Sequence, residues 1–261
     1  MKKIIEIKNL NFSYKNNSVF ENFNLNIFDQ NTSIIGTSAA GKTTLAKILA
    51  GLHFSKDIKI NNLELNKDNL TEIRKNVVVV LNDFSFVAET VYEELAFGME
   101  NLCLTKNQIK LRINKVNKLF NLKNIIEKSP NDLTKDEKTL IKILSFVLMK
   151  PKLIIIDDLI NNLNNITKYK LIDYINEMKV NIVNITSNLE EVLFTDYIIV
   201  LNKGKIILEG KTNLVLNEEK ILKRLGFSLP FIVDLSRQLI SYELIQEVYY
   251  DVDKLVGELW K

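Results

Sequence analysis

A run of consecutive residues near the start of the chain has the types and spacing of a phosphate-binding loop. It reads Gly36-Thr37-Ser38-Ala39-Ala40-Gly41-Lys42-Thr43 and fits the pattern G-x-x-x-x-G-K-[ST] without departure. Glycines let the backbone turn tightly, so that N–H groups point at phosphate oxygens, and the following helix adds positive potential at its N-terminus. We expect a nucleotide to be bound by Gly36, Thr37, Ser38, Ala39, Ala40, Gly41, Lys42, Thr43 and Thr44. The alternative is a glycine-flanked turn that starts an ordinary helix.

Two carboxylates directly follow an apolar run further along the chain. Leu153–Ile156 has the composition of a buried strand and is followed by Asp157 and Asp158. Beside a phosphate loop, Asp157 would hold Mg²⁺ together with the Thr43 hydroxyl, usually through water. Asp158 would then point toward the γ-phosphate. The alternative is a strand that ends in a solvated acidic turn.

The elements that must position these groups form an alternation of strands and helices. Apolar runs predict buried strands, and helical spacing predicts a helix over Thr43–Leu52 and a helical insertion over about 84–150. The motif Asn202-Lys203-Gly204 predicts a hairpin between the strands at 197–201 and 205–208, and a turn is predicted at 14–17. The predicted strands are Ile4–Ile7, Asn24–Phe28, Ser33–Ile35, Val77–Leu81, Leu153–Ile156 and Ile182–Ile185. One stripe predicts a single amphipathic tail helix through Leu244, Ile245, Val248, Val252, Leu255, Val256 and Leu259.

Composition excludes several other classes of protein. The chain has 261 residues, with 35 basic and 32 acidic side chains and a net charge of +3. This small excess gives little support for nucleic-acid binding, and we expect no nucleic-acid partner. No apolar run approaches the ~20 residues that a membrane-spanning helix needs, and the N-terminus has no signal-peptide core. Cys103 is the only cysteine, which rules out an internal disulfide and fits a reducing, cytoplasmic setting.

Taken together, these motifs resemble ABC-type ATP-binding subunits, in the expected order over nearly the whole chain. The resemblance is closer to the ATPase subunits of energy-coupling factor transporters, and to the first of their two paired subunits. It rests on the segments 89–101, 225–231 and 255–261. The resemblance implies a P-loop α/β cassette over 1–228 with an N-terminal antiparallel β part, a helical subdomain at about 84–150, and a C-terminal helical extension over 229–261. It also implies that Tyr14 stacks on adenine; the alternative is an edge-strand aromatic.

The same resemblance implies a function and an assembly. An ATPase of this family couples the binding and hydrolysis of Mg-ATP to uptake of a vitamin or metal ion. It would form a head-to-tail dimer with a second ATPase subunit, beneath a membrane scaffold subunit and a substrate-binding membrane subunit. The chain would therefore lie peripherally on the cytoplasmic face of the membrane.

The signature that faces the nucleotide of the paired subunit departs from the family. The family has Leu-Ser-Gly-Gly-Gln where this chain has Leu133-Thr134-Lys135-Asp136-Glu137. Glycines permit close backbone approach to the γ-phosphate, and here their positions hold a lysine and an aspartate. Asp136 and Glu137 add negative charge near a polyanion, which would weaken closure on the partner's ATP. Thr134 and Glu137 also form the pattern of a capping box that starts a helix.

Positions linked to hydrolysis depart as well. Asp158 stands where the family has a glutamate, Ser187 where it has a switch histidine, and Leu81 where it has a glutamine, with Asn82 beside it. Asn164 replaces an aspartate at the dimer seam. Positioned acid–base catalysis is worth about 10²–10⁴-fold, so we expect Asp158 and Ser187 to support slow turnover or none. Two alternatives follow: a nucleotide-binding subunit that is deficient in hydrolysis and acts as a structural or regulatory partner, and a soluble ABC ATPase without a role in transport.

Overall fold

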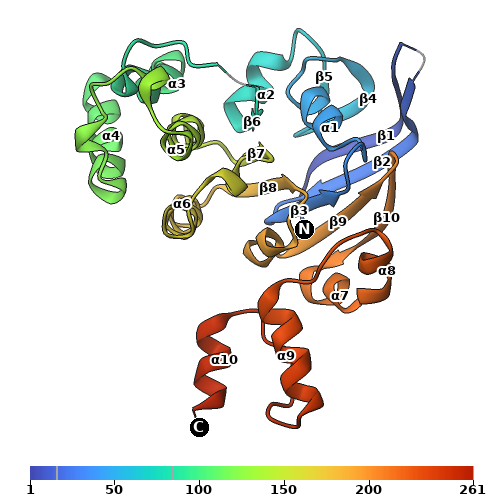
Figure 1. Ribbon diagram of the computed structural model, residues 1–261. Helices are drawn as coiled ribbons and strands as arrows, with labels where there is room; N and C mark the ends of the chain where they lie inside the picture. The colour runs from blue at the N-terminus through green and yellow to red at the C-terminus, as the bar shows by residue number, and fades with distance from the viewer. Residues whose placement is uncertain (16, 84, 261) are drawn as a thin grey trace.

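The protein was analysed as a computed structural model, which describes residues 1–15, 17–83 and 85–260. Within these residues the strands form two sheets (Figure 1). The smaller sheet is antiparallel, with the order β2-β1-β4-β5. Its strands are β1 (Lys3–Tyr14), β2 (Asn17–Phe28), β4 (Ser55–Ile60) and β5 (Leu63–Leu65). The predicted strands at 4–7 and 24–28 are parts of the longer β1 and β2. The predicted turn between them includes Asn16, which lies outside the described residues.

The larger sheet carries the predicted site. Its order is β10-β9-β3-β8-β7-β6, and all neighbours are parallel except the hairpin β9–β10. Because β3, β7 and β8 are parallel neighbours, their carboxyl ends lie at one edge of the sheet, where ligands bind in folds of this kind. Its strands are β3 (Thr32–Gly36), β6 (Val77–Val80), β7 (Leu153–Asp157), β8 (Asn181–Thr186), β9 (Tyr197–Asn202) and β10 (Lys205–Lys211).

Helices divide into three groups around the sheets (Figure 1). Near the smaller sheet lie α1 (Lys42–Leu49) and α2 (Leu70–Asn76). The helical block contains α3 (Val91–Asn101), α4 (Lys106–Phe120) and α5 (Lys135–Val147), and α6 (Asn165–Glu177) lies beside it. Along the hairpin side follow α7 (Thr212–Asn217), α8 (Glu219–Arg224), α9 (Phe231–Ser241) and α10 (Val252–Leu259). The predicted helical insertion is therefore present, whereas its role as a separate subdomain stays a prediction.

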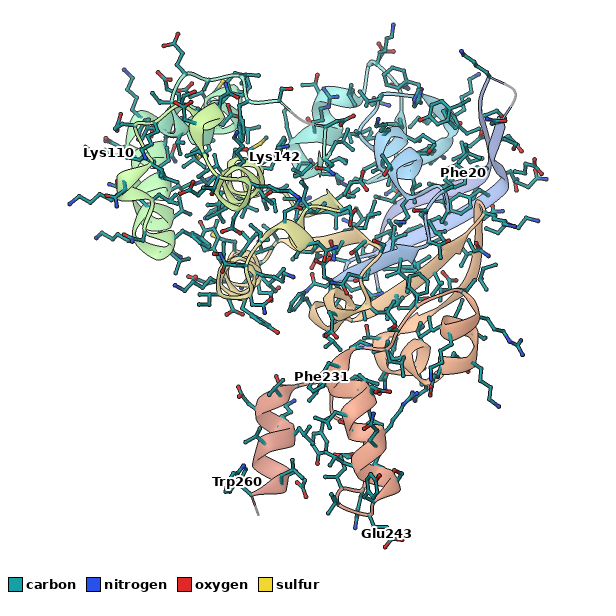
Figure 2. The ribbon with its side chains drawn as sticks, in the orientation of Figure 1. Phe20, Lys110, Lys142, Phe231, Glu243 and Trp260 are labelled. Carbon is teal, nitrogen blue, oxygen red and sulfur yellow. The ribbon has the colours of Figure 1, made fainter. Side chains whose placement is uncertain are left out.

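Three apolar clusters hold this arrangement together. One joins the helical block to β6, β7 and α6, a second fills the space between the two sheets and α1, and a third packs the hairpin against α7–α9. The third cluster includes Ile245 and Leu255, which attach the extension to the body. In Figure 2, Phe231 lies at the junction of the extension with the body, and Glu243 and Trp260 lie toward its far end.

The prediction of one continuous tail helix is wrong. Helix α9 ends at Ser241, the chain between 242 and 251 is not helical, and α10 begins only at Val252. Glu243 has a left-handed backbone (φ 60°) that ends the first helix. Asp251 then caps the second, since its side chain accepts a hydrogen bond from the backbone N–H of Lys254 at 2.9 Å. Local capping of this kind overrides apolar spacing.

A membrane-spanning segment was not expected from the sequence. Across the described ranges, no helix combines the length and the apolar character needed to cross a bilayer.

Candidate functional site

The phosphate loop connects a fully buried strand to a helix, as its sequence predicts. Strand β3 ends at Gly36, and α1 begins at Lys42. A Cβ atom on Gly36 would lie 2.8 Å from both the Ala40 Cβ and the Leu201 carbonyl oxygen. Gly41 has a left-handed backbone (φ 100°), and a Cβ there would lie 3.0 Å from the ring of Phe20. Both glycines of the motif are therefore required by the turn itself.

The Lys42 side chain lies over the loop that its motif predicts it to serve. Its Nζ donates hydrogen bonds to the carbonyl oxygens of Gly36 at 2.6 Å and Thr37 at 3.0 Å. Burial lowers the pKa of Lys42, and the carboxylates of Asp158 and Asp157 act in the opposite direction. A half-buried ammonium in this position gains when it pairs with phosphate oxygens, because an anion is a stronger acceptor than a carbonyl.

Asp157 is the buried carboxylate at the end of β7. Only 2% of its surface is exposed, and among the described residues its Oδ1 atom has no hydrogen-bond partner. Burial raises the pKa of Asp157 to about 6; Thr43 lowers it, Asp158 raises it and Lys42 lowers it, in decreasing order of effect. An orphaned buried oxygen next to a hydroxyl matches the oxygen ligands that Mg²⁺ prefers.

The predicted metal ligands and one of the two predicted catalytic residues, Asp158, line one cavity of about 420 Å³, whereas Ser187 does not line it. Thr43, Asp157 and Asp158 line it together with Asn82 and Asp83. Within the described residues, no cluster of three or more His, Cys, Asp or Glu side chains is arranged to hold a metal by itself. A magnesium ion here would therefore take Thr43 and Asp157 as its protein ligands and complete its shell with water and phosphate oxygens.

Asp83 belongs to this cavity, although the sequence analysis did not identify it. Its carboxylate forms an ion pair with Lys47 of α1 at 3.0 Å. The pKa of Lys47 is raised first by this contact and, in smaller part, by Tyr14 and Asp157. Asp83 follows the end of β6, next to the β7 strand that supplies Asp157. That position at the carboxyl edge of the sheet was the available signal.

Tyr14 lies at the end of β1 and is 42% exposed. Its ring packs edge-on against Phe12, with a centroid separation of 5.0 Å, and against His53 at 5.9 Å. His53 follows α1, so this contact places Tyr14 on the α1 side of the site. Part of the Tyr14 ring packs on Phe12 and His53 and the rest is exposed, an arrangement that suits stacking on a base. This role stays a prediction.

Asp158 and Ser187 lie at neighbouring strand ends. Asp158 has a left-handed backbone (φ 52°), and its N–H donates to the Ile185 carbonyl oxygen of β8 at 2.8 Å. Ser187 follows β8 and is exposed. The sheet therefore brings both residues to the edge that carries the phosphate loop, as the catalytic prediction requires. It does not by itself test that prediction.

The predicted signature segment, residues 133–137, leads into the start of α5 and does not line this cavity. Thr134 caps the helix, and its side chain and that of Glu137 make the reciprocal bonds of a capping box, which confirms the prediction of a helix start. Leu133 is buried. Asp136 accepts hydrogen bonds from the backbone and side-chain amides of Asn164, at 2.8 and 2.7 Å.

A phosphate loop, an acid-tipped neighbouring strand and an antiparallel N-terminal sheet together define a nucleotide-binding cassette. Residues 20–161, more than half of the chain, match the model of the family described as "ABC transporter". The chain therefore belongs to the ABC transporter family.

Its curated relatives give a narrower placement within that family. Over its full length the chain is 30% identical to "Energy-coupling factor transporter ATP-binding protein EcfA" of Pediococcus pentosaceus and covers 97% of that protein. It is 31% identical over 99% of its length to "Energy-coupling factor transporter ATP-binding protein EcfA1" of Oenococcus oeni, of which it covers 98%. The chain therefore belongs with the energy-coupling factor transporter ATP-binding proteins.

Solved structures support the same fold. A cbiO1 structure from Clostridium perfringens, described as part of the ABC transporter complex cbiONQ, is 22% identical with a TM-score of 0.70 over 87% of this chain and 95% of that one. A dimeric ATP-binding cassette in a post-hydrolysis state, bound to ADP and Pi, is 23% identical with a TM-score of 0.70 over 80% of this chain and 99% of its own. The predicted P-loop cassette fold is confirmed.

Proposed function

We propose that this chain is the ATP-binding subunit of an energy-coupling factor transporter, in which it couples the binding and hydrolysis of Mg-ATP to uptake of a vitamin or metal ion. The observation that carries the proposal is the pairing of the phosphate loop with Asp157, whose buried Oδ1 atom has no partner within the described chain. Thr43 and Asp157 would hold Mg²⁺, the loop amides and Lys42 would bind the phosphates, and Tyr14 would stack on adenine. The names of the full-length relatives supply the transporter class.

The names of the same relatives support an assembly with other transporter subunits. We propose a head-to-tail dimer with a second ATPase subunit, attached to a membrane scaffold subunit that also carries a substrate-binding membrane subunit. The chain would lie peripherally on the cytoplasmic face of the membrane. A cassette of the same fold has been solved as a dimer with ADP and Pi, which supports pairing between cassettes as the working form.

Hydrolysis at this chain's own site would be slow. The oxygen of a water molecule attacks the γ-phosphorus, the bond from that phosphorus to the bridging oxygen breaks, ADP leaves with the bond electrons, and the water proton passes to Asp158. An aspartate reaches one methylene less far than a glutamate, and Ser187 is uncharged where the family has a histidine. Ser187 can donate a hydrogen bond to a phosphate oxygen but adds no positive charge there.

A second candidate, a subunit that binds ATP without supporting its hydrolysis, is favoured by one specific observation. Asp136 is held at the start of α5 by both amides of Asn164. A fixed carboxylate at the helix N-terminus that would face the partner's γ-phosphate opposes closure there, because two anions repel. The two candidates differ in whether ATP bound to this chain is cleaved within one binding event.

The test uses the complex purified from membrane extract with this chain as bait. The proposal requires a membrane scaffold and a second ATPase in the complex, and ATPase activity that Lys42→Ala reduces only in part, because the partner's site turns over faster. Recovery of RNA or DNA in place of membrane subunits would favour the soluble ABC ATPase. A complete loss of turnover in Lys42→Ala would show that this site is not the weaker one. Single-turnover cleavage of bound ATP then separates the transport ATPase from the non-consuming subunit.

A further inference from the structure

Asn161 lies between Asp158, which follows the carboxyl end of β7, and the segment that follows β8. It belongs to the short 3-10 helix Ile160–Asn162. Its Nδ2 atom lies 3.3 Å from Asp158 Oδ1 and 3.3 Å from Thr186 Oγ1, so that one amide group donates toward both. Its Oδ1 atom accepts a hydrogen bond from Asn188 Nδ2 at 2.8 Å. One side chain therefore joins the carboxylate in the cavity to the two residues that flank Ser187.

The Thr186 side of this link is buried. Thr186 is fully buried, and its Oγ1 also accepts the backbone N–H of Asn188 at 3.1 Å. Behind it, the fully buried Glu191 interacts with the Thr186 side chain and accepts a hydrogen bond from Asn184 Nδ2 at 2.9 Å. Lys168 of α6 lies 3.7 Å from the other Glu191 oxygen. Asn184 Oδ1 and Glu191 Oε1 have no hydrogen-bond partner among the described residues, so the Thr186 side chain is restrained by its burial and by the bonds just named.

At the other end of this link, the Asp158 carboxylate needs a hydrogen bond that holds it in place. Asp158 has a left-handed backbone, which is costly for a residue other than glycine, and its side chain is short. It shares the cavity with Thr43, Asp157 and Asp83, and negative charge on its neighbours favours a rotamer turned away from them. An amide that donates to Oδ1 opposes that displacement and fixes the rotation of the carboxylate. Catalysis is sensitive to such placement, since an error of about 1 Å costs on the order of 10²-fold in rate.

We propose that Asn161 is a positioning residue for hydrolysis at this chain's own nucleotide site. Its amide holds the Asp158 carboxylate against the Thr186–Asn188 segment. It does so in a site where Ser187 stands at the position expected to hold a histidine. The inference rests on the proposed function, and it adds to that function a residue that acts through Asp158 and does not itself touch the nucleotide.

The test measures single-turnover cleavage of ATP in the purified complex, with the partner ATPase disabled at its own phosphate-loop lysine. Mg-ATP affinity and urea stability are measured beside the rate. Asn161→Ala should slow cleavage about 10- to 100-fold and change the dissociation constant by less than about twofold, since no phosphate contact is removed. Asn162→Ala, in the same short helix, is the matched control and should cleave at the unaltered rate.

Two further variants separate positioning from a structural role. Asn161→Asp keeps the shape of the side chain but removes its donor, so it should cleave at least as slowly as Asn161→Ala; an unaltered rate in Asn161→Asp would overturn the inference. In an Asp158→Ala background, Asn161→Ala should have little further effect, because residues that act as a unit are not additive. If Asn161→Ala slowed cleavage by the same factor in the unaltered protein and in the Asp158→Ala variant, the inference would be overturned as well.

The proposed function and this inference fail in different ways. If the unaltered complex binds Mg-ATP saturably but cleaves none of it, the positioning role of Asn161 is overturned and the ATP-binding function stands. If the complex takes up no Mg-ATP, the ATP-binding function itself is overturned.

Discussion

The side chains of Asp136 and Asn164 bind each other and join the starts of two helices. The Asp136 carboxylate accepts the Asn164 backbone N–H at 2.8 Å and its side-chain amide at 2.7 Å. Asn164 also caps α6, because its Oδ1 accepts the backbone N–H of Thr167 at 3.0 Å. The first turn of α5 is therefore tied to the start of α6. An aspartate at position 164 would place two carboxylates together, so the asparagine is the residue that suits Asp136 here.

Removing the carboxylate of this pair should weaken the fold slightly. Asp136→Ala removes both acceptors and a negative charge at a helix N-terminus, and we expect the free energy of unfolding to fall by about 1 kcal/mol. Urea denaturation of the purified chain measures this loss. Asp132→Ala, at an exposed position just before α5, is the control and should stay within about 0.5 kcal/mol of the unaltered protein. A loss of the same size in the control would contradict the role assigned to the pair.

The ionisation of Asp157 should make stability depend on pH. Its folded-state pKa is raised from 3.8 to about 6, so the ionised form disfavours the folded state above about pH 6, and this penalty disappears below about pH 4. Asp157→Asn should therefore raise the free energy of unfolding at pH 8, by at most about 3 kcal/mol, and change it little at pH 3.5. Thermal or urea unfolding without nucleotide at both pH values measures the difference.

The control for that experiment is Asp173→Asn, at an exposed position on α6, which should change stability little at either pH. If Asp157→Asn stabilised the protein equally at pH 8 and pH 3.5, the burial penalty on Asp157 would be refuted. The same variant should lose the part of nucleotide affinity that depends on Mg²⁺, because an amide is a weaker ligand than a carboxylate for a hard cation.

Gly204 connects the hairpin to the phosphate loop and should not tolerate a side chain. Its N–H donates to the Ala40 carbonyl oxygen at 3.1 Å, its backbone is left-handed (φ 71°), and a Cβ would lie 1.8 Å from the Val19 carbonyl oxygen. Gly204→Ala should lower the free energy of unfolding by about 2 kcal/mol or more and weaken ATP binding. Gly257→Ala, where nothing lies within 4 Å, should be neutral or stabilise by up to about 1 kcal/mol. Similar unfolding midpoints for the two variants would contradict this account.

Tyr14 should contribute to binding of the base and not of the phosphates. Tyr14→Ala should weaken ATP about tenfold, since stacking on an aromatic ring is worth about 1–3 kcal/mol, while tripolyphosphate with Mg²⁺ binds unchanged. Tyr14→Phe keeps the ring and is the matched control. Competition binding with both ligands measures this selectivity, and an equal loss for ATP and tripolyphosphate would point to a structural role for Tyr14.

The phosphate loop and the strand bearing Asp157 could be predicted from the sequence because both depend on local patterns. A glycine pattern dictates a turn, and an apolar run dictates a buried strand. Asp83 and Asn161 could not be found in this way. Their roles depend on which strand ends lie side by side, and only the pairing of β6 with β7 and of β7 with β8 brings them to the site.

In the C-terminal tail, a local sequence pattern predicts the wrong structure. Its apolar spacing suits one long helix, but Glu243 and Asp251 end one helix and begin another. The spacing of apolar residues does not indicate where helix caps lie, so it does not predict where a helix begins or ends. The burial of Ile245 and Leu255, and not of Leu244 or Val256, follows from how the segment after α9 and helix α10 pack on the body.

The central claim is that the loop before Thr43 captures a nucleotide with a divalent ion, and a direct binding titration tests it. Labelled ATP with Mg²⁺ is added to the folded chain, alone and with its companion subunits, for the unaltered protein, Lys42→Ala and the exposed-surface control Lys110→Ala. The account predicts saturable one-site uptake by the unaltered protein and the control, and its loss in Lys42→Ala. No saturable uptake by the unaltered protein, or equal uptake by Lys42→Ala, would contradict it.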